Sequence, residues 1–178
     1  MTTSSTATRT YRSSFSFKDA VLLSANSTNS SWFFSDVVDL NSDDRKDLVF
    51  FGATYPIGAA TSEPRGSLFY WGSGHGTYSL ATDRDITLPK TVHPREVVYA
   101  DFNEDHVLDI FVADHGWDTH PFPGAQNQLL LSGPTGWILK TENLPNVSDY
   151  THCAAAGDVN NDGHIDIFVG NAPGPGSP

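Results

Sequence analysis

Residues 158–166 read DVNNDGHID, and the interpretation of the whole chain starts from this acidic segment. It places carboxylate or amide side chains at the first, third, fifth and ninth positions of a nine-residue loop, and glycine at the sixth. Calcium takes about six to eight oxygen ligands. A tight turn of this kind offers three side-chain oxygens, the main-chain carbonyl of the seventh position and a final carboxylate. Glycine allows the left-handed backbone that such a turn requires, so the stretch predicts a calcium-binding loop.

The same loop occurs twice earlier, as DLNSDDRKD at residues 39–47 and DFNEDHVLD at residues 101–109. The first aspartates of successive copies stand 62 and 57 residues apart, and each copy runs into three apolar residues, so the chain is a repeat array. Aspartate and asparagine are also common in turns that bind no ion, but three copies in one register favour up to three Ca²⁺ ions. The expected ligands, with the seventh position acting through its carbonyl, are Asp39, Asn41, Asp43, Arg45, Asp47, Asp101, Asn103, Asp105, Val107, Asp109, Asp158, Asn160, Asp162, His164 and Asp166.

The acidic balance of the chain agrees with this interpretation. Its net charge is −11 and its pI is near 4.7, which makes nucleic acid an unsuitable partner, because a phosphate backbone needs a basic surface. Aspartates outnumber glutamates 17 to 4, and nine of the aspartates are the first, fifth and ninth residues of the loops. Hydrophobic content of 38% supports a packed core, and no apolar stretch reaches the roughly 18 residues of a membrane span.

Short apolar runs separated by polar and glycine-rich segments surround the loops and predict an all-β fold. Each unit is expected to run strand, acidic loop, strand, long connection, strand, glycine turn, strand, with units starting near residues 32, 94 and 151. Four short strands in about 60 residues is the size of one β-propeller blade, a four-stranded antiparallel sheet. The expected strands are 15–23, 31–38, 48–53, 67–71 and 77–81, then 95–100, 110–113, 126–131 and 137–141, and finally 150–157.

The third loop and the residues after it, DVNNDGHIDIFVG at 158–170, resemble the calcium-binding repeat called FG-GAP or VCBS. FGA at 51–53 and VGNAP at 169–173 resemble the short motif behind the first name. The resemblance covers residues 15–178. Such repeats form the propellers of integrin α-chains and of secreted bacterial and fungal proteins, so the resemblance implies bound calcium and an extracellular or cell-envelope location.

Two copies depart from the pattern of the family at the sixth position, where Asp44 and His106 replace glycine. Both residue types tolerate the left-handed region better than most. The turn is therefore expected to form with some strain and to bind calcium less well than in the third copy. An EF-hand is excluded, because its twelfth position needs a bidentate glutamate and Phe50, Val112 and Val169 stand there.

The number of units is too small to close a propeller ring. Propellers have about four to eight blades, whereas this chain offers about two complete blades plus parts of flanking ones. We therefore expect a fragment of a larger propeller, or a chain that associates with its own copies to cover the open edges. Residues 1–14 are rich in Ser and Thr, have no apolar segment typical of a signal peptide, and predict a disordered tail before a propeller segment at 15–178.

Two connections, the glycine turn at residues 71–75 and the longer connection at residues 114–125, carry aromatic and histidine residues that suit recognition of a carbohydrate. An aromatic ring covers the apolar face of a sugar while polar side chains bind its hydroxyls, and the resemblance extends to fungal lectins that bind sugars between blades. The alternative is that the aromatic residues of the second connection only anchor it to the sheet. The candidate ligand-binding residues are Trp71, His75, His115, Trp117, Asp118 and His120.

Catalysis within these residues is not expected. Asp114, His115, Asp118 and His120 have the chemistry of a transition-metal site, but they occur in one unit only, and neither a Gly-x-Ser-x-Gly elbow nor a His-Glu-x-x-His motif is present. An accessory propeller domain of a secreted carbohydrate-active enzyme and a protein-binding adhesion module remain open alternatives. Cys153, the only cysteine, lies in an apolar run of small residues and is expected to be buried.

Overall fold

The computed structural model describes residues 31–53, 63–82 and 84–173. Within these ranges the chain forms short β-strands, and helix is confined to a single 3₁₀ turn, η1, at Thr141–Asn143. The expected all-β class is therefore confirmed. None of the helical structure in the described part is long and apolar enough to cross a membrane. The tail at 1–14 and the strand expected at 15–23 lie outside the described residues.

The first sheet contains four antiparallel strands in the order β1-β2-β4-β5. The acidic loop at 39–47 joins the first two strands, and a turn closed by a 3.0 Å bond from the Ser73 N–H to the Thr77 carbonyl joins the last two. Strands that follow one another in the predicted unit are therefore neighbours in space. Their bounds are β1 (Ser31–Val38), β2 (Asp47–Ala53), β4 (Leu68–Gly72) and β5 (Tyr78–Leu80).

The second unit repeats this arrangement, and the third begins it with an antiparallel pair around the third acidic loop. The first strand of every unit has a register shift near its start, between Trp32 and Phe34, between Pro94 and Glu96, and between Thr151 and Cys153. The structural repeat therefore extends to the local irregularities of the strands. The bounds are β7 (Pro94–Ala100), β8 (Asp109–Asp114), β9 (Gln128–Leu131), β10 (Ile138–Leu139), β11 (Thr151–Gly157) and β12 (Asp166–Asn171).

A short additional sheet pairs β3 (Arg65–Gly66) with β6 (Lys90–Thr91), in connections where the sequence predicted no strand. The hydroxyl of Thr91 donates to the carbonyl of Gly52 in β2 at 2.6 Å. A Cβ atom on Gly52 would lie 2.7 Å from the carbonyl oxygen of Gly66. Glycine at this position of β2 therefore allows the backbone of β3 to approach.

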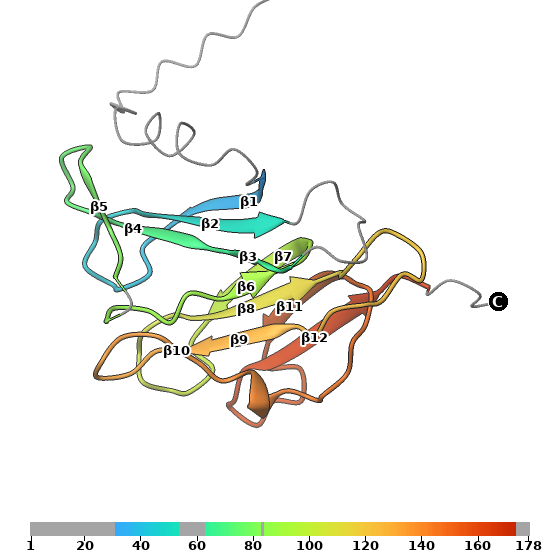
Figure 1. The fold of residues 1–178 in the computed structure, drawn as a ribbon. Coiled ribbons are helices and arrows are strands. Elements are labelled where there is room, and N and C mark those ends of the chain that lie inside the picture. The colour runs from blue at the N-terminus through green and yellow to red at the C-terminus, as the bar shows by residue number, and fades with distance from the viewer. Residues whose placement is uncertain (1–30, 54–62, 83, 174–178) are drawn as a thin grey trace, which may run out of the picture.

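The sheets stack face to face, with the first sheet on one side of the second and the β11–β12 pair on its other side (Figure 1). Strand β8 is buried on both faces, because successive side chains of a strand point to opposite sides. Ile110 and Val112 pack in one cluster with residues of the first sheet such as Phe51. Phe111 and Ala113 pack in a second cluster with residues of β11 and β12. The central sheet thus carries two separate cores.

The outer face of the β11–β12 pair is exposed. Phe168, which points to this face, is 68% exposed. Cys153 is exposed as well, so the expectation of a buried thiol is wrong. Its neighbour Ala154 points to the opposite side and packs against the second core. None of the described sheets closes into a ring.

Candidate functional site

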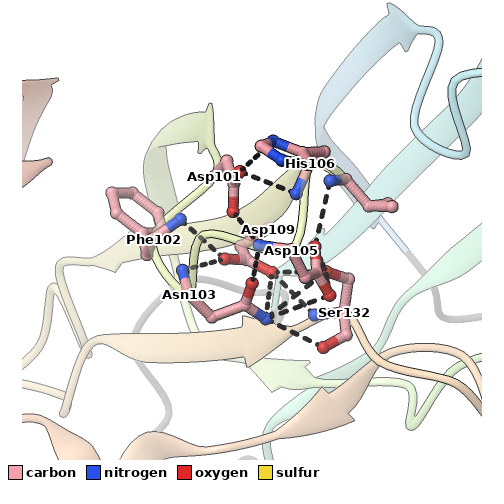
Figure 2. Close-up of polar contacts among 8 residues, drawn as sticks. Asp101, Phe102, Asn103, Asp105, His106, Asp109 and Ser132 are labelled. Atoms are coloured by element: carbon pink, nitrogen blue, oxygen red, sulfur yellow. Dashed lines mark hydrogen bonds and ion pairs between the residues drawn. The ribbon is translucent and has the colours of Figure 1, made fainter. Parts of the chain in front are cut away.

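The three acidic loops occupy the same place in their units and share the same internal hydrogen bonds. In each loop the backbone N–H of the fifth position donates to the side-chain oxygens of the first and third positions, at 2.9–3.2 Å. Figure 2 shows this arrangement for Asp105, whose N–H reaches both Asp101 and Asn103 at 3.0 Å. The oxygens of the first and third positions are therefore directed at the inside of the turn.

Two further bonds recur in every copy. The carboxylate of the fifth position accepts the N–H of the seventh at 2.9–3.0 Å, and the carboxylate of the ninth accepts the N–H of the second at 2.7–3.1 Å. The copies share residue types only at the first, third, fifth and ninth positions. The common geometry therefore comes from these Asp and Asn side chains.

The backbone is left-handed at the sixth position of every copy. The φ angle is 64° at Asp44, 70° at His106 and 92° at Gly163. The two non-glycine residues thus adopt the unfavourable conformation that the sequence predicted for them. The backbone at the fourth position is left-handed too, with φ between 59° and 63°. The three copies share no residue type there, so the sequence did not predict this conformation. The residues at that position are Ser42, Glu104 and Asn161.

The ninth position has a second role in the first two copies. Asp47 and Asp109 are 1% and 0% exposed. The other oxygen of each carboxylate accepts a backbone N–H from the following hairpin, that of Gly72 at 2.9 Å and that of Ser132 at 2.6 Å. Burial raises the pKa of both carboxyl groups, and the hydrogen bonds from backbone N–H groups oppose this only in part. A nearby cation would favour the ionised form of such buried carboxylates.

The third loop is open to solvent, and backbone N–H donors favour the ionised form of two of its carboxylates. The N–H of Gly163 lowers the pKa of Asp158, and the N–H of His164 lowers that of Asp162. The ring nitrogen Nδ1 of His164 also contacts the carboxylate of Glu104 in the second loop, which raises the pKa of His164. The second and third loops are linked by this contact.

A group of side chains of the types that can ligate a metal lies where β7 begins and β8 ends. His93, His115 and Asp118 each place a ligand atom within 4.8 Å of the others, and among the described residues no three aspartates of a loop are gathered so closely. Calcium binding would therefore have to draw the loop carboxylates together.

The contacts within this group run through Asp118. Its Oδ2 atom lies 3.0 Å from His93 Nδ1, and its Oδ1 atom lies 2.6 Å from His115 Nε2. His93 is 2% exposed and His115 is 8% exposed. Burial, reinforced by the positive charge of Arg95, lowers the pKa of His93 to about 4. The His93 imidazole is therefore neutral near pH 7.

The six residues expected to bind a ligand do not form one site. His115 and Asp118 are in contact, whereas His120 is exposed and its ring lies 6.2 Å from that of Phe122. Trp117 is half-buried and its backbone N–H donates to the carbonyl of residue 123 within the same connection. The second connection thus contributes a histidine and a carboxylate to the cluster at its start.

Trp71 lies in β4 of the first sheet, and its side chain packs against the cluster between the first and second sheets. Its ring is 5.5 Å from that of Trp137, and a cavity of about 290 Å³ lies beside the two indoles. Asn41 of the first acidic loop and Asp85 contribute polar groups to the lining of this cavity. His75 is exposed on the turn between β4 and β5.

The sequence did not identify His93 as part of any site. Pro94 pairs with Asp114 in the β7–β8 ladder, so His93 and His115 become neighbours, and the His115 N–H donates to the His93 carbonyl at 3.1 Å. Asp114, considered as a metal ligand from the sequence, instead binds backbone N–H groups, including that of His93 at 2.7 Å. Strand register supplies the information that linear spacing lacks.

Comparison of the chain with known protein families, with characterised proteins and with solved structures finds no match. The assignment of a function therefore rests on the chemistry of these sites.

Proposed function

We propose that this chain is a calcium-binding segment of a β-propeller built from FG-GAP/VCBS-like repeats. Up to three Ca²⁺ ions tie together the first two strands of successive blades. The segment acts as a scaffold or recognition module in an extracellular or cell-envelope setting, where calcium is plentiful.

One observation carries this proposal, namely the common geometry of the three acidic loops. They differ in residue type at five of nine positions, yet they keep the same hydrogen bonds around the fifth position and left-handed backbone at the fourth and sixth positions. The only residues common to all copies are the oxygen donors that a hard cation prefers. A turn that served the chain connection alone would not need three carboxylates in each copy.

Electrostatics supports the same conclusion. Each loop holds at least three carboxylates within nine residues, and two of the ninth-position carboxylates are buried. A bound divalent ion would replace mutual repulsion with coordination, so ion binding and folding are coupled. Calcium modules of the extracellular space bind with Kd values on the order of 10⁻⁴–10⁻³ M.

Thermal unfolding of the 178-residue chain with EGTA and with added calcium, at matched ionic strength, tests the proposal. When the free calcium concentration is 100 times the Kd of a site, binding adds about 2.7 kcal/mol to the free energy of unfolding. Tm should therefore rise with calcium and fall again on chelation. Titration calorimetry should find up to three sites. An unchanged Tm together with no heat of binding would refute the proposal.

A matched pair of variants in the first loop separates ligation from net charge. Asp43 and Asp44 are adjacent and both exposed, but only Asp43 is a proposed ligand. Asp43→Asn should reduce the calcium-dependent gain in Tm, whereas Asp44→Asn, with the same change of charge, should leave most of it. Equal losses in the two variants would show that the calcium-dependent gain in Tm comes from net charge and not from ligation by Asp43.

Carbohydrate recognition is a second candidate, supported by the cavity beside Trp71 and Trp137. Indole surfaces suit the apolar faces of a sugar, and the carboxylate of Asp85 suits its hydroxyls. Hydrogen bonds from the backbone and hydroxyl of Thr82 lower the pKa of Asp85, so this carboxylate stays an acceptor at neutral pH. A glycan array probed with the wild type and with Trp71→Ala tests this, and Trp117→Ala in the other connection is the control. Binding that survives Trp71→Ala would exclude this cavity.

A further inference from the structure

His93, His115 and Asp118 are brought together by the pairing of β7 with β8, at a place outside all three acidic loops. His93 directly precedes β7, and His115 directly follows β8. Their backbones are joined by the bond from the His115 N–H to the His93 carbonyl, at 3.1 Å. The two imidazoles thus come from neighbouring strands at the same end of one antiparallel ladder.

A buried carboxylate holds this arrangement in place. Asp114 is 1% exposed and accepts the backbone N–H of Val92 at 2.8 Å, of His93 at 2.7 Å and of Gly116 at 3.2 Å. It therefore ties the segment before β7 to the segment after β8. Because both histidines are also more than nine-tenths buried, their positions are restricted before any ligand arrives.

The donor atoms are spaced for a small cation. His93 Nδ1 and His115 Nε2 lie 3.0 Å and 2.6 Å from separate oxygens of Asp118, and the ligand atoms all lie within 4.8 Å of one another. In tetrahedral zinc sites, with Zn–N distances of about 2.0–2.1 Å, neighbouring donors are about 3.3 Å apart. A small outward shift of the Asp118 carboxylate would bring its distances to the two imidazole nitrogens close to this value.

We propose that His93, His115 and Asp118 form a binding site for a divalent transition-metal ion of the Zn²⁺ type. Two imidazoles and one carboxylate are a ligand set that zinc accepts, and three protein ligands leave the fourth position of a tetrahedral ion for water or another oxygen donor. Asp118 is 36% exposed at its side chain, so the ion would be reachable from solvent. The site is chemically distinct from the all-oxygen calcium loops, since imidazole favours zinc over calcium.

The competing explanation is a purely protein-based cluster. Arg95 Nη2 lies 3.4 Å from Asp118 Oδ2, so Asp118 is also placed to bridge an arginine and two histidines. Binding of an ion requires Arg95 to give up this contact, which its 30% exposed side chain permits. His152 of β11, whose ring lies 4.5 Å from that of His115, places another imidazole at the edge of the cluster.

Zinc titration of the untagged chain in saturating calcium tests the site. Calorimetry should find one Zn²⁺ per chain with micromolar or tighter affinity, and Co²⁺ should give the visible absorption of a tetrahedral site. Absence of zinc uptake by the folded wild type would overturn the proposal. Calcium binding is measured in a separate titration of the same preparation. A failure of the zinc proposal can therefore be distinguished from a failure of the calcium proposal.

Variants locate the ion. Asp118→Asn and His115→Ala should each weaken zinc binding by at least about tenfold, because even residues that only orient a metal ligand change affinity by about 10–100-fold. His120→Ala changes an exposed histidine of the same connection and should leave zinc affinity unchanged. Circular dichroism checks that the variants fold. If His115→Ala does not fold, Asp118→Asn alone serves as the test. Equal zinc affinity in Asp118→Asn and His120→Ala would overturn the assignment.

Discussion

The carboxylate of Asp109 accepts a hydrogen bond from the backbone N–H of Ser132, with Oδ1 and N 2.6 Å apart. Asp47 and Gly72 form the equivalent bond in the first unit, at 2.9 Å. In both units the last residue of the acidic loop therefore fixes the turn between the third and fourth strands. Because the same carboxylate also closes the loop, an ion bound there would stabilise the whole four-stranded sheet.

Replacing Asp109 by asparagine should destabilise the chain even without calcium. The side chain is 0% exposed and accepts the N–H groups of Phe102, Asn103 and Ser132. An amide in its place sets an NH₂ group against these donors, and a buried group without a partner costs about 1–3 kcal/mol. Urea unfolding in EGTA measures the difference. Asp166→Asn, at the same position of the exposed third loop, should cost less, and equal costs would contradict the role of the hairpin bond.

The third copy should bind calcium more tightly than the first. Gly163 takes φ of 92° without the steric penalty of a side chain, whereas Asp44 is held at φ of 64°. Asp162→Ala should therefore remove more of the calcium-dependent gain in Tm than Asp43→Ala. Calorimetry of the two variants measures which site is lost. A larger loss for Asp43→Ala would show that backbone strain at the sixth position does not set affinity.

Gly163→Ala should reduce stability through its backbone alone. A Cβ at Gly163 would meet no atom within 4 Å, but φ there is 92°, and the left-handed conformation costs an L-residue about 1–2 kcal/mol. Gly157→Ala is the matched control, because its Cβ would also meet no atom and its φ is not in the left-handed region. Chemical unfolding of both variants should separate them by about 1 kcal/mol. Equal stability of the two would argue against a strained sixth position.

Much of the fold could be predicted from periodicity and turn residues. The range 31–38 matches β1, and the order of strands around each acidic loop matches the sheets. These features are local, since apolar runs and glycine turns signal strands regardless of what they pack against. The exposure of Cys153 could not be predicted in this way, because it depends on what covers the outer face of β11.

The candidate sites also differ in how far the sequence alone could predict them. Oxygen donors at fixed spacing identified the acidic loops, because all the proposed ligands of one loop lie within nine residues. His93 is 22 residues from His115 in sequence, and only the pairing of Pro94 with Asp114 brings them together. The hairpin bonds of Asp47 and Asp109 also depend on a return of the chain more than 20 residues later. Contacts of this kind require the sheet register, which one sequence does not supply.

Phe111 and Phe168 occupy equivalent positions after the second and third acidic loops, yet they should differ sharply on truncation. Phe111 is 2% exposed and packs with Ala154 and Ile167, whereas Phe168 is 68% exposed. Phe111→Ala should cost about 3–5 kcal/mol through the cavity it leaves, and the milder Phe111→Leu keeps the comparison measurable if that variant unfolds. Phe168→Ala should change the free energy of unfolding by less than about 0.5 kcal/mol. Urea unfolding at two protein concentrations measures both, and a large, concentration-dependent cost for Phe168→Ala would reveal a second copy covering this face.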